Sequence, residues 1–211
     1  MKESLRGLYA ITDKKLIARE DFIEAVEKAL IGGASIIQLR EKETNQEELI
    51  RLGKDILMIT KSHRVPLIIN DSPELAKEIG AEGVHLGEHD CSIAYARSVL
   101  GEDAIIGVSC YGQIERGINA EREGADYVAF GTSYYTPTKP DREPTSVDVL
   151  KEAVEKIKRI PIFAIGGITV DNARTIMDTG VDGIAVITSI FGSDDPEQAA
   201  RELAAEARAS K

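Results

Sequence analysis

Short apolar runs alternate with segments of helical periodicity along the chain. Runs rich in isoleucine and valine, each long enough for a buried strand, occur at residues 7–12, 35–40, 66–70, 83–87, 105–110, 127–132, 162–167 and 183–188. Apolar positions spaced three and four apart predict helices at residues 21–33, 45–60, 72–80, 146–157 and 169–180, and another helix from near Ser92. Eight alternations predict a single α/β domain over residues 1–211, a (β/α)8 TIM barrel. An open doubly wound sheet is the alternative, but it usually needs fewer strands, and no G-x-G-x-x-G turn follows the first run.

The acidic balance of the chain limits its partners. Lys and Arg number 26 against 36 Asp and Glu, which gives a formal net charge of −10. Long-range repulsion therefore opposes a general nucleic-acid or anionic membrane surface, and any anion must bind at a local cluster of cations. Two cysteines, Cys91 and Cys110, form no disulfide framework, and the first residues hold no long apolar run. We expect a cytoplasmic protein with small-molecule partners and neither nucleic acid nor membrane, as a monomer or a homo-oligomer.

The stretch GVHLGEHD, residues 83–90, contains His85, Glu88 and His89 in the order H-x-x-E-H, which marks some zinc hydrolases. Such a site needs a helix, on which positions four apart share a face. The apolar run here predicts a strand, along which the two histidines would lie about 13 Å apart, too far for one zinc ion. We therefore expect His85 in the barrel and His89 in a loop. Asp90 would lie in the loop after the fourth strand, on the face where barrel active sites are found.

Polar side chains also mark the second and fifth strands. Alternation along the second strand places Gln38, Arg40 and Lys42 on one side, either as a solvated stripe or as a path of cations at the top of the barrel. Because the stripe emerges at the end of a barrel strand, we favour the second interpretation. The fifth strand is expected to end at Ser109, which is either a site residue or a helix cap.

The third strand is followed directly by an amide and a carboxylate, Asn70 and Asp71. Asp71 and Asp90 would be carboxylates on neighbouring loops, which suits Mg²⁺ because this ion binds through one or two carboxylates plus phosphate oxygens. The alternative is that residues 70 and 71 cap the helix that starts near Pro73. Both roles are compatible with the sequence.

The loops after the last three strands carry groups that suit phosphate. The long loop after the sixth strand holds two hydroxyls and a cation, at Thr136, Thr138 and Lys139. The loops after the seventh and eighth strands form the common phosphate cradle of this fold, and here they contain Gly166, Gly167, Ile187 and Thr188. The residues alone thus predict a barrel with one phosphate site and a second anion site.

Seven motifs in order resemble the thiamine-phosphate synthase family, over residues 7–204. They are QLREK (38–42), IIND (68–71), GVHLGEHD (83–90), IGVS (106–109), TPTKPD (136–141), AIGGI (164–168) and DGIAVIT (182–188). The resemblance implies an enzyme that joins hydroxymethylpyrimidine diphosphate to hydroxyethylthiazole phosphate and releases pyrophosphate by a dissociative mechanism with Mg²⁺. The chain departs from the usual family pattern at Ser72, where a basic or aromatic residue is common, and at Glu88, where glutamine is common.

The resemblance also assigns roles to individual residues. It implies that Asp71 and Asp90 ligate Mg²⁺. It implies a substrate-binding set made of Gln38, Leu39, Arg40, Glu41, Lys42, Asn70, Ser109, Thr136, Pro137, Thr138, Lys139, Gly167, Ile187 and Thr188. Within that set, catalysis would depend on Arg40, Lys42, Ser109 and Lys139, because they neutralise or position the departing diphosphate.

Two alternative functions share the barrel and the phosphate cradle. One is the related thiazole tautomerase, and the other is a non-catalytic sensor of thiamine phosphate or thiazole phosphate. The tautomerase resemblance would place a histidine two residues after the serine of GVS, where this chain has Tyr111. A phenol is a poor base near neutral pH, so we expect synthase activity without appreciable isomerisation.

Overall fold

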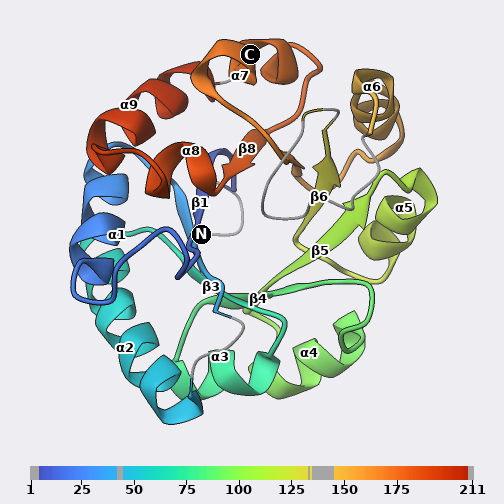
Figure 1. Ribbon diagram of the computed structural model, residues 1–211. Helices are drawn as coiled ribbons and strands as arrows, with labels where there is room; N and C mark the ends of the chain where they lie inside the picture. Colours follow the sequence, from blue (N-terminus) through green and yellow to red (C-terminus); the bar gives the residue numbers. More distant parts are fainter. Residues whose placement is uncertain (1–4, 42–44, 133, 135–144, 209–211) are drawn as a thin grey trace.

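The computed structural model describes residues 5–41, 45–132, 134 and 145–208. Eight parallel strands pair in chain order and close into a barrel, with β1 hydrogen-bonded to β8 (Figure 1). They are β1 (Gly7–Ile11), β2 (Ile36–Leu39), β3 (Leu67–Asn70), β4 (Gly83–Leu86), β5 (Ile105–Tyr111), β6 (Tyr127–Gly131), β7 (Ile162–Ile165) and β8 (Gly183–Val186). The predicted (β/α)8 barrel and all eight of its strands are confirmed.

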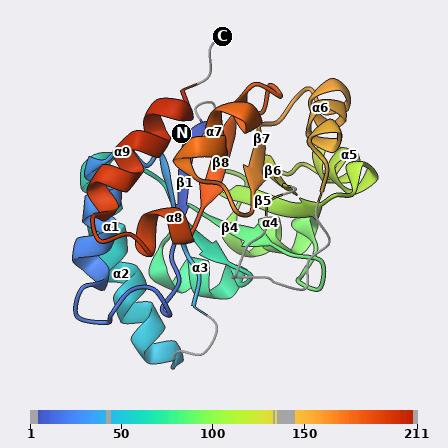
Figure 2. The ribbon, with the colours of Figure 1, turned by 45° about the horizontal axis from the view of Figure 1, so that its top comes forward.

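Helices surround the barrel on the outside. They are α1 (Phe22–Ile31), α2 (Gln46–His63), α3 (Pro73–Ile79), α4 (Ile93–Leu100), α5 (Ile114–Arg122), α6 (Val147–Lys156), α7 (Val170–Met177), α8 (Thr188–Phe191) and α9 (Pro196–Glu206). The last helix, α9, packs against α1 and so closes the outer ring (Figure 2). The six helices predicted from periodicity are present, whereas α5, α8 and α9 were not predicted. Among the described residues, no helix combines the length and the apolar character that a membrane crossing requires.

Several helices begin where a short polar side chain satisfies their first free N–H groups. Asn45, Ser72, Ser92 and Asp195 each accept a hydrogen bond from the first turn of α2, α3, α4 and α9. A proline follows the cap of α3 and of α9, where its missing N–H costs nothing. The caps of α2, α3 and α4 fix the points at which the chain leaves the loops after β2, β3 and β4 and enters the outer layer.

The strands divide their side chains between two apolar layers. Outward-facing residues pack against the helices, and inward-facing ones fill the barrel in a separate cluster. The inner cluster contains Tyr9, Ile11, Ile36, Ile68, Ile105, Tyr127, Ala129, Phe163 and Ala185, together with Leu5. Gln38 and His85 are buried on the same inward side and bring polar groups into the interior, where they bond to the hydroxyls of Tyr9 and Tyr127. The barrel is therefore a packed core with polar groups inside it, not a pore.

The even-numbered strands are preceded by a shared turn pattern. A glycine three residues before β2, β4, β6 and β8 has φ between 83° and 107°, a region that favours glycine. Before three of these strands, the residue adjoining the strand is acidic and accepts a hydrogen bond from the N–H of the preceding strand. The contacts are Glu82 to Leu67 (2.9 Å), Asp126 to Ile106 (2.8 Å) and Asp182 to Ile162 (3.0 Å). These bonds fix the pairing of strands at the end of the barrel opposite the candidate site.

Candidate active site

The end of β2 brings an arginine to the rim of the barrel. The Arg40 Nη1 atom lies 3.4 Å from Asp13 Oδ2, and its backbone N–H donates to Thr12 Oγ1 at 3.1 Å. Both side chains of the ion pair are largely buried, with 14% and 13% of their surface exposed. Asp13 lies two residues after β1 and directly follows the predicted run 7–12. It had not been singled out from the sequence, although a carboxylate just after an apolar run is the signal that identified Asp71. The pair therefore holds the guanidinium at the rim in one orientation.

The other members of the QLREK motif occupy different positions. Gln38 points into the barrel, on the side opposite Leu39 as alternation predicted, and its Nε2 donates to the Tyr9 hydroxyl at 2.5 Å. The Leu39 side chain is only 1% exposed and packs in the outer layer, so only its main chain can meet a ligand. Glu41 is half-buried, and Lys42 lies outside the described residues.

The two candidate metal ligands follow β3 and β4. Asp71 has a φ of 68°, and its N–H donates to the His85 carbonyl at 2.8 Å. Asp90 accepts the N–H of Gly87 at Oδ2, at 2.6 Å. The helix cap after β3 is Ser72, whose hydroxyl accepts from Leu75, so the alternative that residues 70 and 71 cap this helix is wrong.

The positive φ of Asp71 is informative because it places an L-residue in a sparsely populated region, and such strain concentrates at functional sites. Both Asp71 and Asp90 are half-buried, and they offer hard oxygen donors on neighbouring loops. This donor set fits the mode in which Mg²⁺ takes one or two carboxylates and completes its shell with water and phosphate oxygens.

The H-x-x-E-H stretch is not a zinc site. His85 lies in β4 and is 7% exposed, as expected for a barrel residue. Its Nδ1 lies 2.9 Å from the Tyr127 hydroxyl and its Nε2 lies 2.9 Å from Ser109 Oγ, so both ring nitrogens already have partners. No group of three or more His, Cys, Asp or Glu side chains suited to a metal occurs among the described residues.

The fifth strand extends one residue beyond the predicted run 105–110 and two beyond Ser109. It ends at Tyr111, with an irregular register between Ser109 and Tyr111, and Tyr111 has a φ of 56°. The next helix begins after Gln113, so the alternative that Ser109 caps it is wrong. Ser109 is half-buried and bonds to His85.

Arg116 of α5 supports this end of β5. No pattern in the sequence had pointed to this residue. Its Nε donates to the Ser109 carbonyl at 2.6 Å, and its Nη2 donates to the Gly87 carbonyl at 3.0 Å. The guanidinium carbon also lies 6.0 Å from the centre of the Tyr111 ring. One side chain thus ties the loop that contains Asp90 to the strand that carries Ser109.

The loops after β7 and β8 lie side by side. Gly166 and Gly167 have φ of 118° and 58°, and β7 and β8 end at Ile165 and Val186, earlier than predicted. Ser189 Oγ donates to the Ile168 carbonyl at 2.6 Å and so joins the two loops. Ile187 and Thr188 are half-buried at the start of α8. Half-buried glycine backbone beside a helix start offers N–H groups to an anion.

The predicted residues of the loop after β6, Thr136, Pro137, Thr138 and Lys139, lie outside the described residues. The described end of that loop is anchored, because Thr132 donates its hydroxyl to the Gly166 carbonyl and its carbonyl accepts the N–H of Thr145 at 3.1 Å. The chain therefore enters and leaves this loop next to the glycines that follow β7.

Comparison with known proteins decides the family. A family model described as thiamine monophosphate synthase matches residues 8–190. The chain belongs to the thiamine monophosphate synthase family. It is 48% identical over 200 residues to a thiamine-phosphate synthase from Nitrosococcus oceani, covering 95% of this chain and 92% of that protein. It is 41% identical over 201 residues to one from Thermoplasma acidophilum, with coverage of 95% and 92%.

A solved structure agrees with the thiamine monophosphate synthase assignment. The thiamine phosphate pyrophosphorylase from Pyrococcus furiosus superposes with a TM-score of 0.88 at 37% identity, covering 98% of this chain and 96% of that one. The family that the seven motifs resembled is therefore confirmed. The candidate residues that the structure describes in this family member come from β2, β3, β4, β5, β7 and β8, all at or near the carboxyl ends of the strands.

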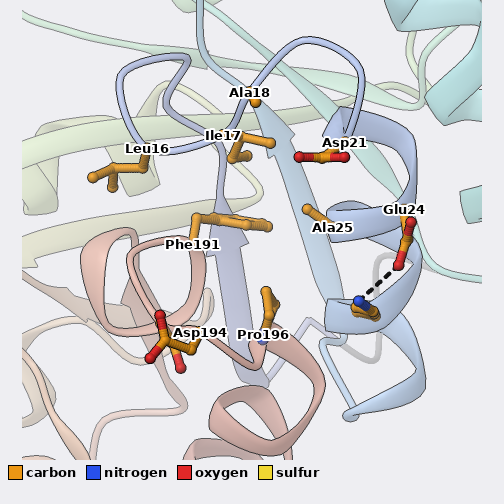
Figure 3. Close-up of a pocket in the computed structure, with 11 residues that line it drawn as sticks. Leu16, Ile17, Ala18, Asp21, Glu24, Ala25, Phe191, Asp194 and Pro196 are labelled. Atoms are coloured by element: carbon orange, nitrogen blue, oxygen red, sulfur yellow. Dashed lines mark ion pairs between the residues drawn. The ribbon is translucent and has the colours of Figure 1, made fainter.

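A separate groove of about 320 Å³ lies outside the barrel, between α1 and the segment that joins α8 to α9 (Figure 3). Apolar side chains such as Ile17 and Phe191 form part of its wall, which also holds three carboxylates, at Asp21, Glu24 and Asp194, and one cation, Lys28. Its described lining contains no candidate site residue. An acidic lining is also the wrong charge for the phosphorylated substrates of a thiamine monophosphate synthase.

Proposed function

We propose that this chain is a thiamine-phosphate synthase that condenses hydroxymethylpyrimidine diphosphate with hydroxyethylthiazole phosphate, giving thiamine phosphate and pyrophosphate. The observation that carries the proposal is the family match over residues 8–190, together with the placement of Arg40, Asp71 and Asp90 at one end of the barrel. The acceptor is the thiazole phosphate or its carboxylated form.

The chemistry that fits these residues is substitution at the pyrimidine methylene carbon. The C–O bond to diphosphate breaks and its electron pair leaves with the diphosphate, and the lone pair of the thiazole nitrogen then forms the new C–N bond. No protein nucleophile is needed, so the chain has to neutralise the leaving group and align the acceptor. Arg40, held by Asp13, supplies one fixed positive charge for that purpose.

The remaining binding roles are those that the family resemblance implies. Gln38, Asn70 and Ser109 would hold the pyrimidine diphosphate with Lys42 and Lys139, and the glycine loop with Thr188 would hold the thiazole phosphate. Asp71 and Asp90 would hold Mg²⁺, which when bound screens the charge of the diphosphate. The half-buried positions of both carboxylates support this assignment.

We infer that the enzyme works in the cytoplasm as a small-molecule enzyme without nucleic-acid or membrane partners. Cys91 and Cys110 are both free thiols, which suits a reducing compartment. The formal net charge of −10 opposes binding to polyanionic surfaces.

The test is incubation of the purified protein with both substrates and Mg²⁺, with thiamine phosphate and pyrophosphate measured separately. The variant Asp71→Asn with Asp90→Asn should abolish turnover, whereas Asp55→Asn, on the exposed face of α2, should leave it unchanged. Near wild-type turnover in the double variant would refute the metal assignment. Binding of thiazole phosphate without turnover in the wild-type protein would favour a sensor.

A further inference from the structure

A chain of hydrogen bonds crosses the interior of the barrel between two candidate substrate residues. Gln38 Nε2 donates to the Tyr9 hydroxyl at 2.5 Å, and the hydroxyls of Tyr9 and Tyr127 lie 2.8 Å apart. Tyr127 lies 2.9 Å from His85 Nδ1, and His85 Nε2 lies 2.9 Å from Ser109 Oγ. Five strands each contribute one member, so the contacts are made only when the barrel has closed.

These hydrogen-bonded side chains are packed tightly inside the barrel. Tyr9 and Tyr127 are 1% and 0% exposed, and the His85 ring stacks on Tyr127 with centroids 5.5 Å apart. A Cβ at Gly107 would lie 2.0 Å from Cζ of Tyr127, so the phenol fits only because β5 has glycine there. Ser109, at the end of the chain, is half-buried and belongs to the predicted substrate pocket.

The direction of donation along this hydrogen-bond chain follows from the number of protons on each member. Tyr9 accepts from the Gln38 amide, so its own proton goes to Tyr127. Burial raises the pKa of both phenols, so each keeps its single proton, and Tyr127 donates in turn to Nδ1 of His85. A neutral imidazole that accepts at Nδ1 carries its proton on Nε2 and donates it to Ser109.

We propose that Tyr9, Tyr127 and His85 are positioning residues that hold the Ser109 hydroxyl as a hydrogen-bond donor toward the substrate. Because Ser109 already accepts from His85, its own proton is directed elsewhere, and it suits an acceptor atom on the pyrimidine diphosphate. A donor fixed in advance needs no reorganisation when charge develops on the substrate. The proposal deepens the synthase function and rests on it for the identity of the ligand.

The direction of donation along the hydrogen-bond chain can be measured without an activity assay. The protein has three histidines, so long-range ¹H–¹⁵N correlation of the imidazoles gives a simple spectrum, and His85→Gln assigns the signals of His85. We expect the neutral ring with its proton on Nε2. A proton on Nδ1 would reverse the chain, make Ser109 the donor to histidine and overturn the proposal.

The positioning role is tested by kinetics with Tyr127→Phe, which keeps the ring and removes the hydroxyl that joins the two halves of the chain. We expect kcat/KM to fall at least about tenfold. Tyr95→Phe removes a hydroxyl bonded to Glu74 on the exposed face of α4 and should leave kcat/KM unchanged. Unchanged kinetics in Tyr127→Phe would refute the role.

A double-mutant cycle separates positioning from general damage to the fold. If Tyr127 acts through Ser109, Tyr127→Phe should cost nothing more once Ser109→Ala is present. The same fold-loss in both backgrounds would mean that Tyr127 is structural, and the proposal would fail. If the wild-type protein has no synthase activity, the proposed function fails, while the tautomer of His85 still decides the direction of the chain.

Discussion

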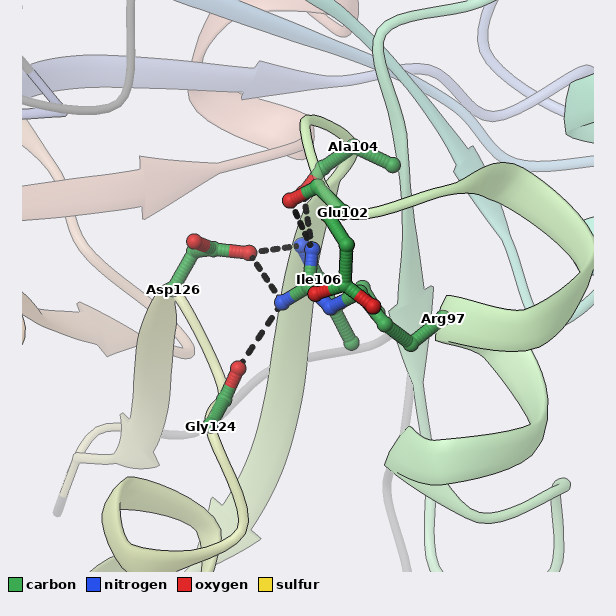
Figure 4. A network of polar contacts seen from close by, with 6 residues as sticks. All are labelled: Arg97, Glu102, Ala104, Ile106, Gly124 and Asp126. Carbon is green, nitrogen blue, oxygen red and sulfur yellow. Dashed lines mark hydrogen bonds and ion pairs between the residues drawn. The ribbon is translucent and has the colours of Figure 1, made fainter.

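Arg97 forms a network at the end of the barrel opposite the candidate site, and its removal should destabilise the protein without affecting chemistry. From α4 its Nη2 donates to the Gly124 carbonyl at 2.8 Å and to Asp126 Oδ2 at 2.9 Å, and its Nη1 donates to the carbonyls of Glu102 and Ala104 (Figure 4). Both charged side chains are 14% exposed. One guanidinium thus joins the loops that precede β5 and β6.

The expected loss in the free energy of unfolding for Arg97→Gln follows from the carboxylate that is left without its cation. Asp126 would keep its bond from the Ile106 N–H at 2.8 Å but would lose its cation while mostly buried. Breaking such a pair costs about 3–5 kcal/mol when fully buried, and the small exposure here places the expected loss near about 3 kcal/mol. At an unfolding entropy of about 2.1 cal/mol/K per residue, this corresponds to a fall in Tm of about 7 °C.

The matched control is Arg174→Gln. Arg174 pairs with Asp178 on one helix at 3.0 Å, with side chains 52% and 63% exposed, so the loss should be about 0.3–0.5 kcal/mol. Calorimetry and urea unfolding of both variants measure the difference, and kcat/KM at about 25 °C should match the wild type in each. If Arg97→Gln melts no lower than the control, the buried network does not stabilise the barrel as argued.

Three further predictions concern the site and the thiols. Arg40→Ala should lower kcat/KM by about 10²–10³ at a temperature where the variant is folded, and its Tm should also fall because Asp13 loses its ion pair. A lower Tm with unchanged kinetics would make Arg40 a structural ion. With Tyr111 in place of a histidine, NMR of the tautomerase substrate should show no double-bond migration, and isomerisation faster than synthesis would contradict the synthase assignment. Burial raises the pKa of the Cys110 thiol to about 12. Between about pH 9 and that value the unfolded thiol loses its proton first, so the free energy of unfolding should fall by up to about 1.4 kcal/mol per pH unit. Urea unfolding at about pH 8 and pH 10 should show a smaller fall in Cys110→Ala, and equal falls would contradict the assignment.

The sequence by itself was sufficient for the architecture, and it pointed to the end of the barrel that carries the candidate site. Apolar runs and helical periodicity are local signals, and eight repeats of them left few folds to consider. Alternation placed Gln38 on the side of β2 opposite Leu39, and strand position placed His85 in the barrel, and both are confirmed. The short helix α8 and the polar α5 were missed, because a four-residue helix has no period and α5 has few apolar positions.

The tertiary structure decided which polar groups meet. Residues that are 118 positions apart, Tyr9 and Tyr127, share a hydrogen bond, and Arg116 of α5 reaches back past β5 to the loop of Asp90. The helix cap that the sequence offered as an alternative role for residues 70 and 71 belongs to Ser72, and Asp71 takes a left-handed conformation. Such contacts depend on the closure and register of the barrel, which bring distant strands together at fixed offsets. No local pattern encodes those offsets, so the pairing of side chains inside the barrel could be known only from the folded chain.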